Sequence, residues 1–405
     1  MKPAPLNLYI PQPPARPGQA ANFDHVSFDI GAAARRPDWD APETDLRELP
    51  YGLIRVQGVE DSPWNPHLDA DVLRQGLRFM VETRLFEDRL FRAHRQGKTS
   101  FFMKSTGEEA IGVALAMALE PTDMCFPTYR VQGWLHARGY PLETMINQIY
   151  SNAKDPLRGR QLPVLYSARD YGFYSLSGNL GTRFGHAVGW AMASAYSGAR
   201  EIALGCIGEG STAEGAFHEG LTFASVYRAP VILAITNNQW AISTFSGMAG
   251  AERTTFAAKA LAYGIPGLRV DGNDFLAIWA ATQWAAARAR ANLGPTLIEF
   301  LSYRVAGHST SDDPTRYRPV DEGAHWPLGD PVERLRDHLV ALGEWSVERH
   351  AQMEAELADA LKTAQRAAEK VGTFGQSKPP LDDMFEGVFR DPDWRLVEQR
   401  RELDS

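Results

Sequence analysis

The sequence contains few cysteines and no long apolar run, and each shortage excludes a class of protein. Only Cys125 and Cys206 occur among 405 residues, which is too few for a disulfide-stabilised secreted scaffold. Their apolar surroundings predict buried thiols in a reducing compartment. No stretch approaches 18 uncharged apolar residues, so we expect no membrane-spanning helix. The N-terminus lacks both an apolar signal core and an Arg/Ser-rich presequence, so a cytoplasmic location is the default expectation.

Basic charge is also scarce. The 42 Lys and Arg residues are outnumbered by 50 Asp and Glu, which gives a net charge of −8 and a pI near 5.7. This balance argues against binding to nucleic acid or to an anionic membrane. Hydrophobic residues make up 44% and charged residues 23% of the chain, as in an ordinary globular protein with a large α/β domain and appendages. We find no internal repeat and no lipoyl-type lysine turn.

The most informative stretch spans residues 201–243. A continuous apolar run over residues 202–207 predicts a strand that is buried on both faces. The run ends at Gly208-Glu209-Gly210, where small residues let a ligand approach the backbone. A second apolar run, residues 231–235, predicts another buried strand that ends at Asn237-Asn238. This pattern is one βαβ unit with polar residues at the carboxyl ends of both strands, where open parallel sheets bind ligands.

A carboxylate and an amide at neighbouring strand ends would supply hard oxygen ligands. Mg²⁺ prefers such ligands and usually completes its octahedron with phosphate oxygens and water. Ser211 and Glu214 match an S-x-x-E capping box, which predicts that a helix begins there, and a helix N-terminus favours an anion. The residues by themselves therefore point to a Mg²⁺-diphosphate site.

Two other interpretations of these residues remain open. Residues 208–213, GEGSTA, fit the relaxed dinucleotide fingerprint G-x-G-x-x-G/A. An NAD site also needs an acidic residue at the end of the second strand to bind the ribose, and the chain has Asn237 and Asn238 there. The other interpretation is a tight turn before a capped helix, with no ligand at all.

Four separated motifs carry a resemblance to a known family. The GEG turn followed by the Asn pair resembles the thiamine diphosphate motif, GDG and then NN, with Glu209 in place of the usual Asp. The others are Tyr129-Arg130, SGNLGT at residues 177–182 and GHSTSDD at residues 307–313. Together, in this order, they resemble the alpha subunit of the heterotetrameric 2-oxoacid dehydrogenase decarboxylating component. Residues 100–110, SFFMKSTGEEA, are closer to the branched-chain type than to the pyruvate type.

The resemblance implies site roles that the residue types alone do not establish, because an isolated His or Arg is more often structural. The family's diphosphate is contacted by a Tyr-Arg pair, and its loop His assists acyl transfer to a lipoyl group. Thr128 would face the substrate, and Arg304 would contact the diphosphate or order the loop. The implied catalytic residues are His308 and Tyr129. The implied cofactor-binding residues are Tyr129, Arg130, Gly178, Leu180, Gly208, Glu209, Gly210, Asn238, Arg304 and His308. The implied Mg²⁺ ligands are Glu209, the Asn238 side chain and the Trp240 backbone carbonyl.

Besides Glu209, three positions of the chain depart from the family pattern. Thr236 replaces an Arg that often precedes the Asn pair, so Arg130 would carry more of the diphosphate charge. Asn179 and Arg183 replace a Pro and a Gln in the segment that binds a monovalent cation in eukaryotic branched-chain members. Ser309 matches a position that is phosphorylated in some of those members, although nothing in this sequence suggests a dedicated kinase.

The fold implied is a thiamine diphosphate-binding α/β fold, a mostly parallel, doubly wound sheet with helices on both faces. We expect an extended Pro-rich arm over residues 1–50, the α/β domain over 51–328, and a helical region with a partner-binding tail over 329–405. Small residues recur every four positions from Gly181 to Ser197, and this spacing predicts a helix face that is buried against another subunit.

The activity implied is oxidative decarboxylation of branched-chain 2-oxoacids such as 2-oxoisovalerate, with thiamine diphosphate and Mg²⁺ as cofactors. The acyl group would pass to the lipoyl arm of a transacylase. The chain would work in an alpha2beta2 heterotetramer, because in this family a Glu of the beta chain activates the cofactor. The alternatives are a pyruvate or acetoin dehydrogenase alpha subunit, an NAD-dependent dehydrogenase and a non-catalytic assembly subunit.

Overall fold

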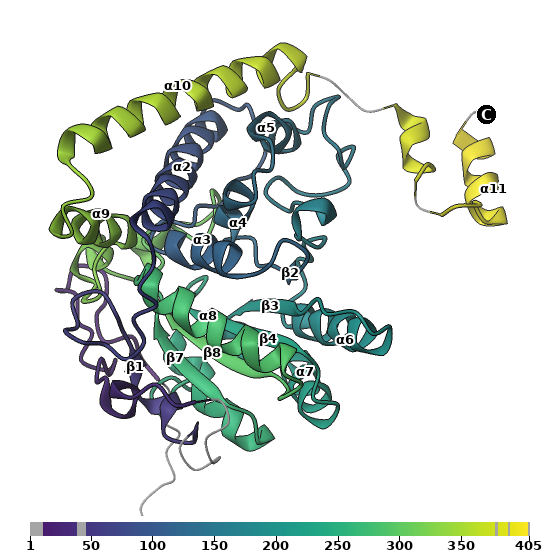
Figure 1. Cartoon of the computed structure of the whole chain (residues 1–405). Helices are drawn as coiled ribbons and strands as arrows, with labels where there is room; N and C mark the ends of the chain where they lie inside the picture. The colour runs from purple at the N-terminus through teal and green to yellow at the C-terminus, as the bar shows by residue number, and fades with distance from the viewer. Residues whose placement is uncertain (1–10, 39–45, 377–379, 388, 404–405) are drawn as a thin grey trace, which may run out of the picture.

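A six-stranded parallel sheet forms the centre of the chain in the computed structural model, which describes residues 11–38, 46–376, 380–387 and 389–403. Its strand order is β1-β7-β8-β4-β3-β2 (Figure 1). All five pairings are parallel. The strands are β1 (Leu53–Ile54), β2 (Met124–Phe126), β3 (Ala203–Gly208), β4 (Val231–Asn237), β7 (Gly267–Asp271) and β8 (Thr296–Leu301). The predicted parallel α/β class is confirmed.

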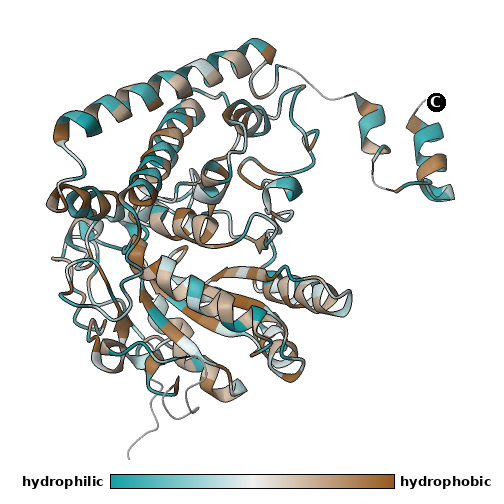
Figure 2. Ribbon diagram, in the orientation of Figure 1, coloured by the Kyte–Doolittle hydropathy of each residue, from teal (hydrophilic) through white to brown (hydrophobic). Residues whose placement is uncertain are grey.

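The sheet is covered by helices on both faces because its central strands are apolar on both sides. Alternate residues of β3 and β4 enter two separate cores, as the two-residue period of a strand requires. One core contains α3 (Glu109–Ala118) and α8 (Phe275–Arg290), and the other contains α6 (Thr182–Tyr196) and α7 (Gly215–Val226). Figure 2 shows hydrophobic colours along the central strands. The prediction of a doubly wound sheet therefore holds.

A further layer of helices extends the core that contains α3 and α8 away from the sheet. In Figure 1, α10 (Val347–Val371) lies across α2 (Ala70–Arg95) and α5 (Leu142–Tyr150). The remaining members of this layer are α4 (Gln132–Ala137) and α9 (Pro331–Ala341). Two helices of the predicted C-terminal helical region begin at a side-chain cap, since Asp330 caps α9 and Ser346 caps α10.

The predicted capping box is wrong. The chain leaves β3 through a 3-10 turn, η4 (Glu209–Ala213), and α7 begins only at Gly215. Glu214 is the N-cap residue, and its side chain makes no capping bond within the described structure. The tight turn places Ser211 four residues before the helix, too far to reach the first helical N–H groups.

The small-residue face of α6 is exposed in this chain. Gly185, Gly189, Ala193 and Ser197 all face solvent, and Tyr196 beside them is 96% exposed. The predicted burial therefore does not occur within the described chain. Burial against another subunit stays a prediction.

The described part of the N-terminal arm packs on the chain's own body. Phe23 meets the rings of Tyr303 and Trp326 edge-on, and Phe28 also meets Trp326. At the other end, α11 (Trp394–Leu403) stands apart from the body in Figure 1 and contains no buried described residue. Residues 1–10, 39–45 and 377–379 of the predicted arm and tail lie outside the described residues, and the domain division stays a prediction.

Both cysteines are buried and free, as predicted. They lie on neighbouring strands, β2 and β3, and burial together with the nearby Cys206 thiol raises the pKa of Cys125. In the described part of the chain we find no helix with the length and apolarity that crossing a membrane requires.

Glu87 is a buried carboxyl group on α2 that fixes the loop after it. Its two oxygens accept hydrogen bonds from the Ser105 amide at 2.7 Å and from the Ser105 hydroxyl at 2.6 Å. Burial, with a smaller contribution from Glu109, raises the pKa of Glu87 to about 8 from an ordinary value of 4.5. The folded chain thus holds a proton that the unfolded chain releases above pH 4.5. Stability should therefore fall as pH rises from about 4.5 to about 8 and level off above that.

We predict that E87Q removes this pH-dependent loss, since a neutral amide has no ionisation penalty. Its melting temperature should gain on that of the wild type by a few degrees between pH 5 and pH 8, measured by differential scanning calorimetry. E356Q, which changes an exposed carboxylate on α10, controls for the loss of a charge. A difference that is constant with pH, or that shrinks toward pH 8, would contradict the assignment.

Candidate functional site

A cavity of about 510 Å³ opens at the carboxyl ends of β3 and β4. Its size suits a cofactor or a drug-sized ligand. Every site residue that the sequence predicted lies on its wall, and Thr128 lies there too. These residues are Tyr129, Arg130, Gly178, Leu180, Gly208, Glu209, Gly210, Asn238, Trp240, Arg304 and His308. Segments far apart in the sequence meet here because parallel strands end at the same edge of the sheet.

The turn after β3 is closely packed against the small hairpin formed by β5 (Trp240–Ala241) and β6 (Thr244–Phe245). A Cβ atom at Gly210 would lie 2.6 Å from the Cβ atom of Ala241. A glycine at this position therefore lets the hairpin close over the turn and form one wall of the cavity.

Glu209 is buried at the base of the cavity, 2% exposed, with one oxygen unsatisfied. Its Oε2 atom accepts a hydrogen bond from the backbone N–H of Asn238, at a distance of 3.4 Å. Its Oε1 atom has no hydrogen-bond partner among the described residues. Burial, with the neighbouring Glu108 adding to it, raises the pKa of Glu209 to about 7. A buried carboxylate oxygen without a partner is costly, and a cation at Oε1 would remove that cost.

The residues around Glu209 fit a hard divalent cation. Within the described ranges, no cluster of three His, Cys, Asp or Glu residues could hold a metal, so a metal here would need mixed ligands. The Glu209 carboxylate, the Asn238 amide oxygen and the Trp240 carbonyl are such a set, and all three residues line the cavity. These oxygen donors are the kind that Mg²⁺ takes together with phosphate and water.

Arg304 orders the backbone around this position. It is 1% exposed, and its Nη1 atom donates to the Trp240 carbonyl at 2.7 Å. Its Nη2 atom donates to the Ile242 carbonyl at 2.8 Å and to the Tyr317 hydroxyl at 2.7 Å. A carbonyl oxygen has two lone pairs, so the Trp240 oxygen keeps one for a metal. Of the two roles expected for Arg304, these bonds support loop ordering.

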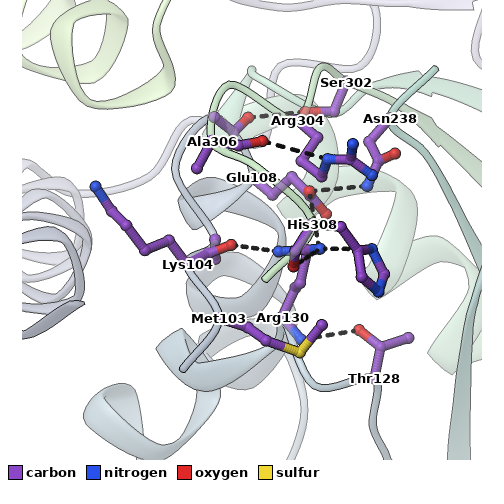
Figure 3. A network of polar contacts seen from close by, with 12 residues as sticks. Met103, Lys104, Glu108, Thr128, Arg130, Asn238, Ser302, Arg304, Ala306 and His308 are labelled. Carbon is purple, nitrogen blue, oxygen red and sulfur yellow. Dashed lines mark hydrogen bonds and ion pairs between the residues drawn. The ribbon is translucent and has the colours of Figure 1, made fainter. Parts of the chain in front are cut away.

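Arg130 fixes the orientation and the charge of His308 (Figure 3). Its Nη2 atom donates to the His308 carbonyl at 2.6 Å and lies 3.1 Å from His308 Nδ1. Because a guanidinium only donates, Nδ1 must accept, and the proton of the neutral ring is on Nε2. Burial, followed by the charges of Arg130 and Arg304, lowers the pKa of His308 to about 3. The imidazole is therefore neutral at physiological pH.

The loop that carries His308 is held at several points. Asp312 Oδ2 accepts from the His308 amide and from the Tyr317 hydroxyl, both at 2.6 Å. Arg318 donates to three successive carbonyls of the loop, those of residues 304–306. The Tyr129 ring meets the His308 ring edge-on, with centroids 5.7 Å apart. The imidazole is thus positioned before any ligand binds.

Comparison with known proteins agrees with this geometry. The model of the dehydrogenase E1 component family matches residues 77–375, and the model of the 2-oxoisovalerate dehydrogenase E1 alpha subunit N terminal matches residues 4–43. The chain belongs to the dehydrogenase E1 component family, among its alpha subunits. The family resemblance inferred from the sequence is therefore confirmed, and membership implies thiamine diphosphate as cofactor and a beta subunit as partner.

Three relatives of this E1 alpha chain carry the same name, 2-oxoisovalerate dehydrogenase subunit alpha. It is 51% identical to the 2-oxoisovalerate dehydrogenase subunit alpha of Pseudomonas aeruginosa, over 98% of both chains. It is 37% identical to the mitochondrial subunit alpha of Mus musculus, over 87% of this chain and 79% of the mouse chain. It is 36% identical to the Homo sapiens subunit, over 99% and 90% of the two chains. These matches give no support to the NAD-binding interpretation.

The sequence missed two charged residues on the cavity wall of this E1 alpha chain. Arg183, 3% exposed, donates from Nη2 to the Ser177 carbonyl and lies 6.0 Å from the Tyr129 ring centroid. Its Nε atom has no partner in the part of the chain that the structure describes. Glu108 contacts Asn238. The helix dipole alone favours two adjacent carboxylates at the start of a helix, so their residue types carried no signal for a role in the site.

We predict that Y317F loosens the His308 loop of this E1 alpha chain without unfolding it. The change removes the hydroxyl that accepts from Arg304 and donates to Asp312, and each such charged hydrogen bond is worth about 1.5–3 kcal/mol. Hydrogen–deuterium exchange of residues 306–313 should become at least about tenfold faster, because local opening costs less. Y227F, at an exposed tyrosine after α7, is the control. Unchanged exchange in Y317F would show that the bridge does not hold the loop.

Proposed function

We propose that this chain is the alpha subunit of a thiamine diphosphate- and Mg²⁺-dependent E1 component that decarboxylates branched-chain 2-oxoacids such as 2-oxoisovalerate. Its acyl product passes to the lipoyl group of a transacylase. The observation that carries the cofactor assignment is the unsatisfied Oε1 atom of Glu209, buried beside Asn238 at the ends of two neighbouring strands. Thiamine diphosphate supplies the electron sink that decarboxylation of a 2-oxoacid requires.

Three residues hold the metal in this proposal. Glu209, Asn238 and the Trp240 carbonyl would hold Mg²⁺, and the metal would supply positive charge for a diphosphate. Arg130 lies on the same wall and contributes positive charge for the anionic group. Gly208 and Gly210 leave the backbone accessible, and Gly178 and Leu180 also line the cavity.

His308 acts as a hydrogen-bond donor on the wall of the cavity. With Nδ1 occupied by Arg130, its Nε2–H group is free to donate, and the lowered pKa keeps the ring neutral. We assign to this N–H group a hydrogen bond that orients the acyl-accepting lipoyl group. Tyr129 packs edge-on against the ring and restricts its rotation.

The outer wall of the cavity favours an apolar substrate chain. Leu180, Ile242 and Met248 line the cavity and are each at least half exposed, beside the more buried Phe245. A branched alkyl group would cover these side chains, and burial of apolar surface contributes roughly 25 cal/mol per Å². A methyl group, as in pyruvate, would cover less of them.

The proposed enzyme depends on partner subunits and works in the cytoplasm. The exposed small-residue face of α6 and the apolar residues of α11, including Trp394 at 72% exposure, are proposed contacts with other subunits. The activating Glu comes from the beta chain, so the alpha chain alone is inactive. The division at residues 50 and 328 is part of the same proposal.

The first test uses the alpha chain co-purified with its beta partner, with thiamine diphosphate and Mg²⁺ present. Dye reduction should be faster with 2-oxoisovalerate than with pyruvate or acetoin, and absent for the alpha chain alone. E209A should weaken thiamine diphosphate binding at limiting Mg²⁺ by at least about 100-fold, because it removes a charged metal ligand. E214A, at an exposed Glu five residues later, is the matched control.

Three results would contradict this proposal at different levels. Full activity of the alpha chain alone would refute the heterotetramer. Unchanged cofactor affinity in E209A would refute the metal assignment. Preference for pyruvate or acetoin would refute the branched-chain substrate and leave the cofactor site in place.

A further inference from the structure

Glu108 is a buried carboxylate on the cavity wall that none of the roles above uses. It is 4% exposed. Its Oε1 atom accepts a hydrogen bond from Asn238 Nδ2 at 2.9 Å and lies 3.8 Å from Arg130 Nε. Figure 3 shows its carboxyl group between the side chains of Arg130, Arg304 and Asn238. It therefore contacts both a proposed metal ligand and a proposed diphosphate contact.

The backbone before Glu108 directs the Glu108 side chain toward the cavity. Gly107 has a φ of +96°, and a Cβ atom there would lie 2.2 Å from the Tyr303 carbonyl oxygen, so glycine is required at this close approach. The Gly107 carbonyl accepts from the Ser302 hydroxyl at 2.8 Å and from Asn273 Nδ2 at 3.0 Å. The turn is thereby fixed to the end of β8, beside the metal position.

The two adjacent carboxylates, Glu108 and Glu109, have separate environments. Glu109 pairs with Arg84 at 2.7 Å and accepts from the Gly107 amide at 2.8 Å, so it stabilises the turn itself. Glu108 is at the N-cap position of α3, yet its side chain makes no capping bond within the described structure. A role in starting the helix therefore does not explain it.

We propose that Glu108 is a positioning residue for the metal site, because it fixes the orientation of the Asn238 amide. This inference rests on the proposed function. A carboxylate oxygen accepts hydrogen bonds, and Asn238 presents its Nδ2 atom to Glu108. Its Oδ1 atom is therefore on the other side of the amide, where it accepts from the Trp240 backbone N–H at 3.3 Å and keeps a lone pair for a metal. The carboxylate also balances the buried charges of Arg130 and Arg304. Partners that orient a metal ligand typically change metal affinity by 10–100-fold.

The test compares E108Q and E108M in the complete alpha–beta complex. E108Q keeps an oxygen that can accept from Asn238 but loses the charge, whereas E108M loses both. At saturating thiamine diphosphate, we expect the dissociation constant of Mg²⁺ to rise about tenfold in E108Q and about 100-fold in E108M. Affinity for thiamine diphosphate at saturating Mg²⁺ should stay within about threefold of the wild type. Calorimetric titration measures both, and the electron paramagnetic resonance spectrum of bound Mn²⁺ should change in E108M.

E109Q is the matched control, because it breaks the adjacent ion pair with Arg84. It should lower the melting temperature and leave the dissociation constant of Mg²⁺ unchanged. If Glu108 were purely structural, E108Q and E108M would behave like E109Q, with a lower melting temperature and an unchanged dissociation constant of Mg²⁺. This result would overturn the inference. If E108M does not fold, E108Q decides: an unchanged Mg²⁺ dissociation constant overturns the inference. A wild-type complex that binds no thiamine diphosphate would instead refute the proposed function.

Discussion

Four buried charges at the ends of β3 and β4 hold the site together: Arg130 and Arg304 against Glu108 and Glu209. All four are at most 5% exposed. A buried charge is tolerated only when it is paired and hydrogen-bonded, and removal of one partner typically costs about 3–5 kcal/mol. Both arginines donate to backbone carbonyls. Arg130 also pairs with Glu108 at 3.8 Å, and Arg304 pairs with Asp312 at 3.9 Å. The Oε1 atom of Glu209 does not satisfy it, and a divalent cation would complete the cluster.

The fold makes this cluster possible because it brings distant segments to one edge of the sheet. Arg130 donates to the carbonyls of Lys104 and His308. Arg304 donates to those of Trp240 and Ile242, so these two arginines join residues 99–108, 237–243 and 303–318. These bonds determine the chemistry as well as the shape. Burial and the charges of Arg130 and Arg304 lower the pKa of His308, so that its ring remains a neutral hydrogen-bond donor on the cavity wall.

The sequence predicted those parts of the molecule that depend on local pattern. Apolar runs identified β3 and β4, and the rule that ligands bind at the carboxyl ends of parallel strands placed Glu209 and Asn238 together. Family motifs identified the other cavity residues. Features set by long-range contacts were missed. The S-x-x-E pattern suggested a capping box, but a 3-10 turn after β3 separates Ser211 from the helix. The contact of Glu108 with Asn238 joins residues 130 positions apart, and no periodicity predicts it. The small-residue face of α6 is exposed within this chain, and its burial against another subunit stays a prediction.

The central claim is that the buried cluster is a Mg²⁺-diphosphate site, and anomalous X-ray scattering from a complex with Mn²⁺ and thiamine diphosphate tests it most directly. The account predicts one anomalous peak between Glu209 Oε1 and Asn238 Oδ1, at metal–ligand distances of about 2.1 Å, with the Trp240 carbonyl as a third protein ligand. A cofactor bound in the cavity with no peak at these atoms, or with a peak held by other residues, would contradict it.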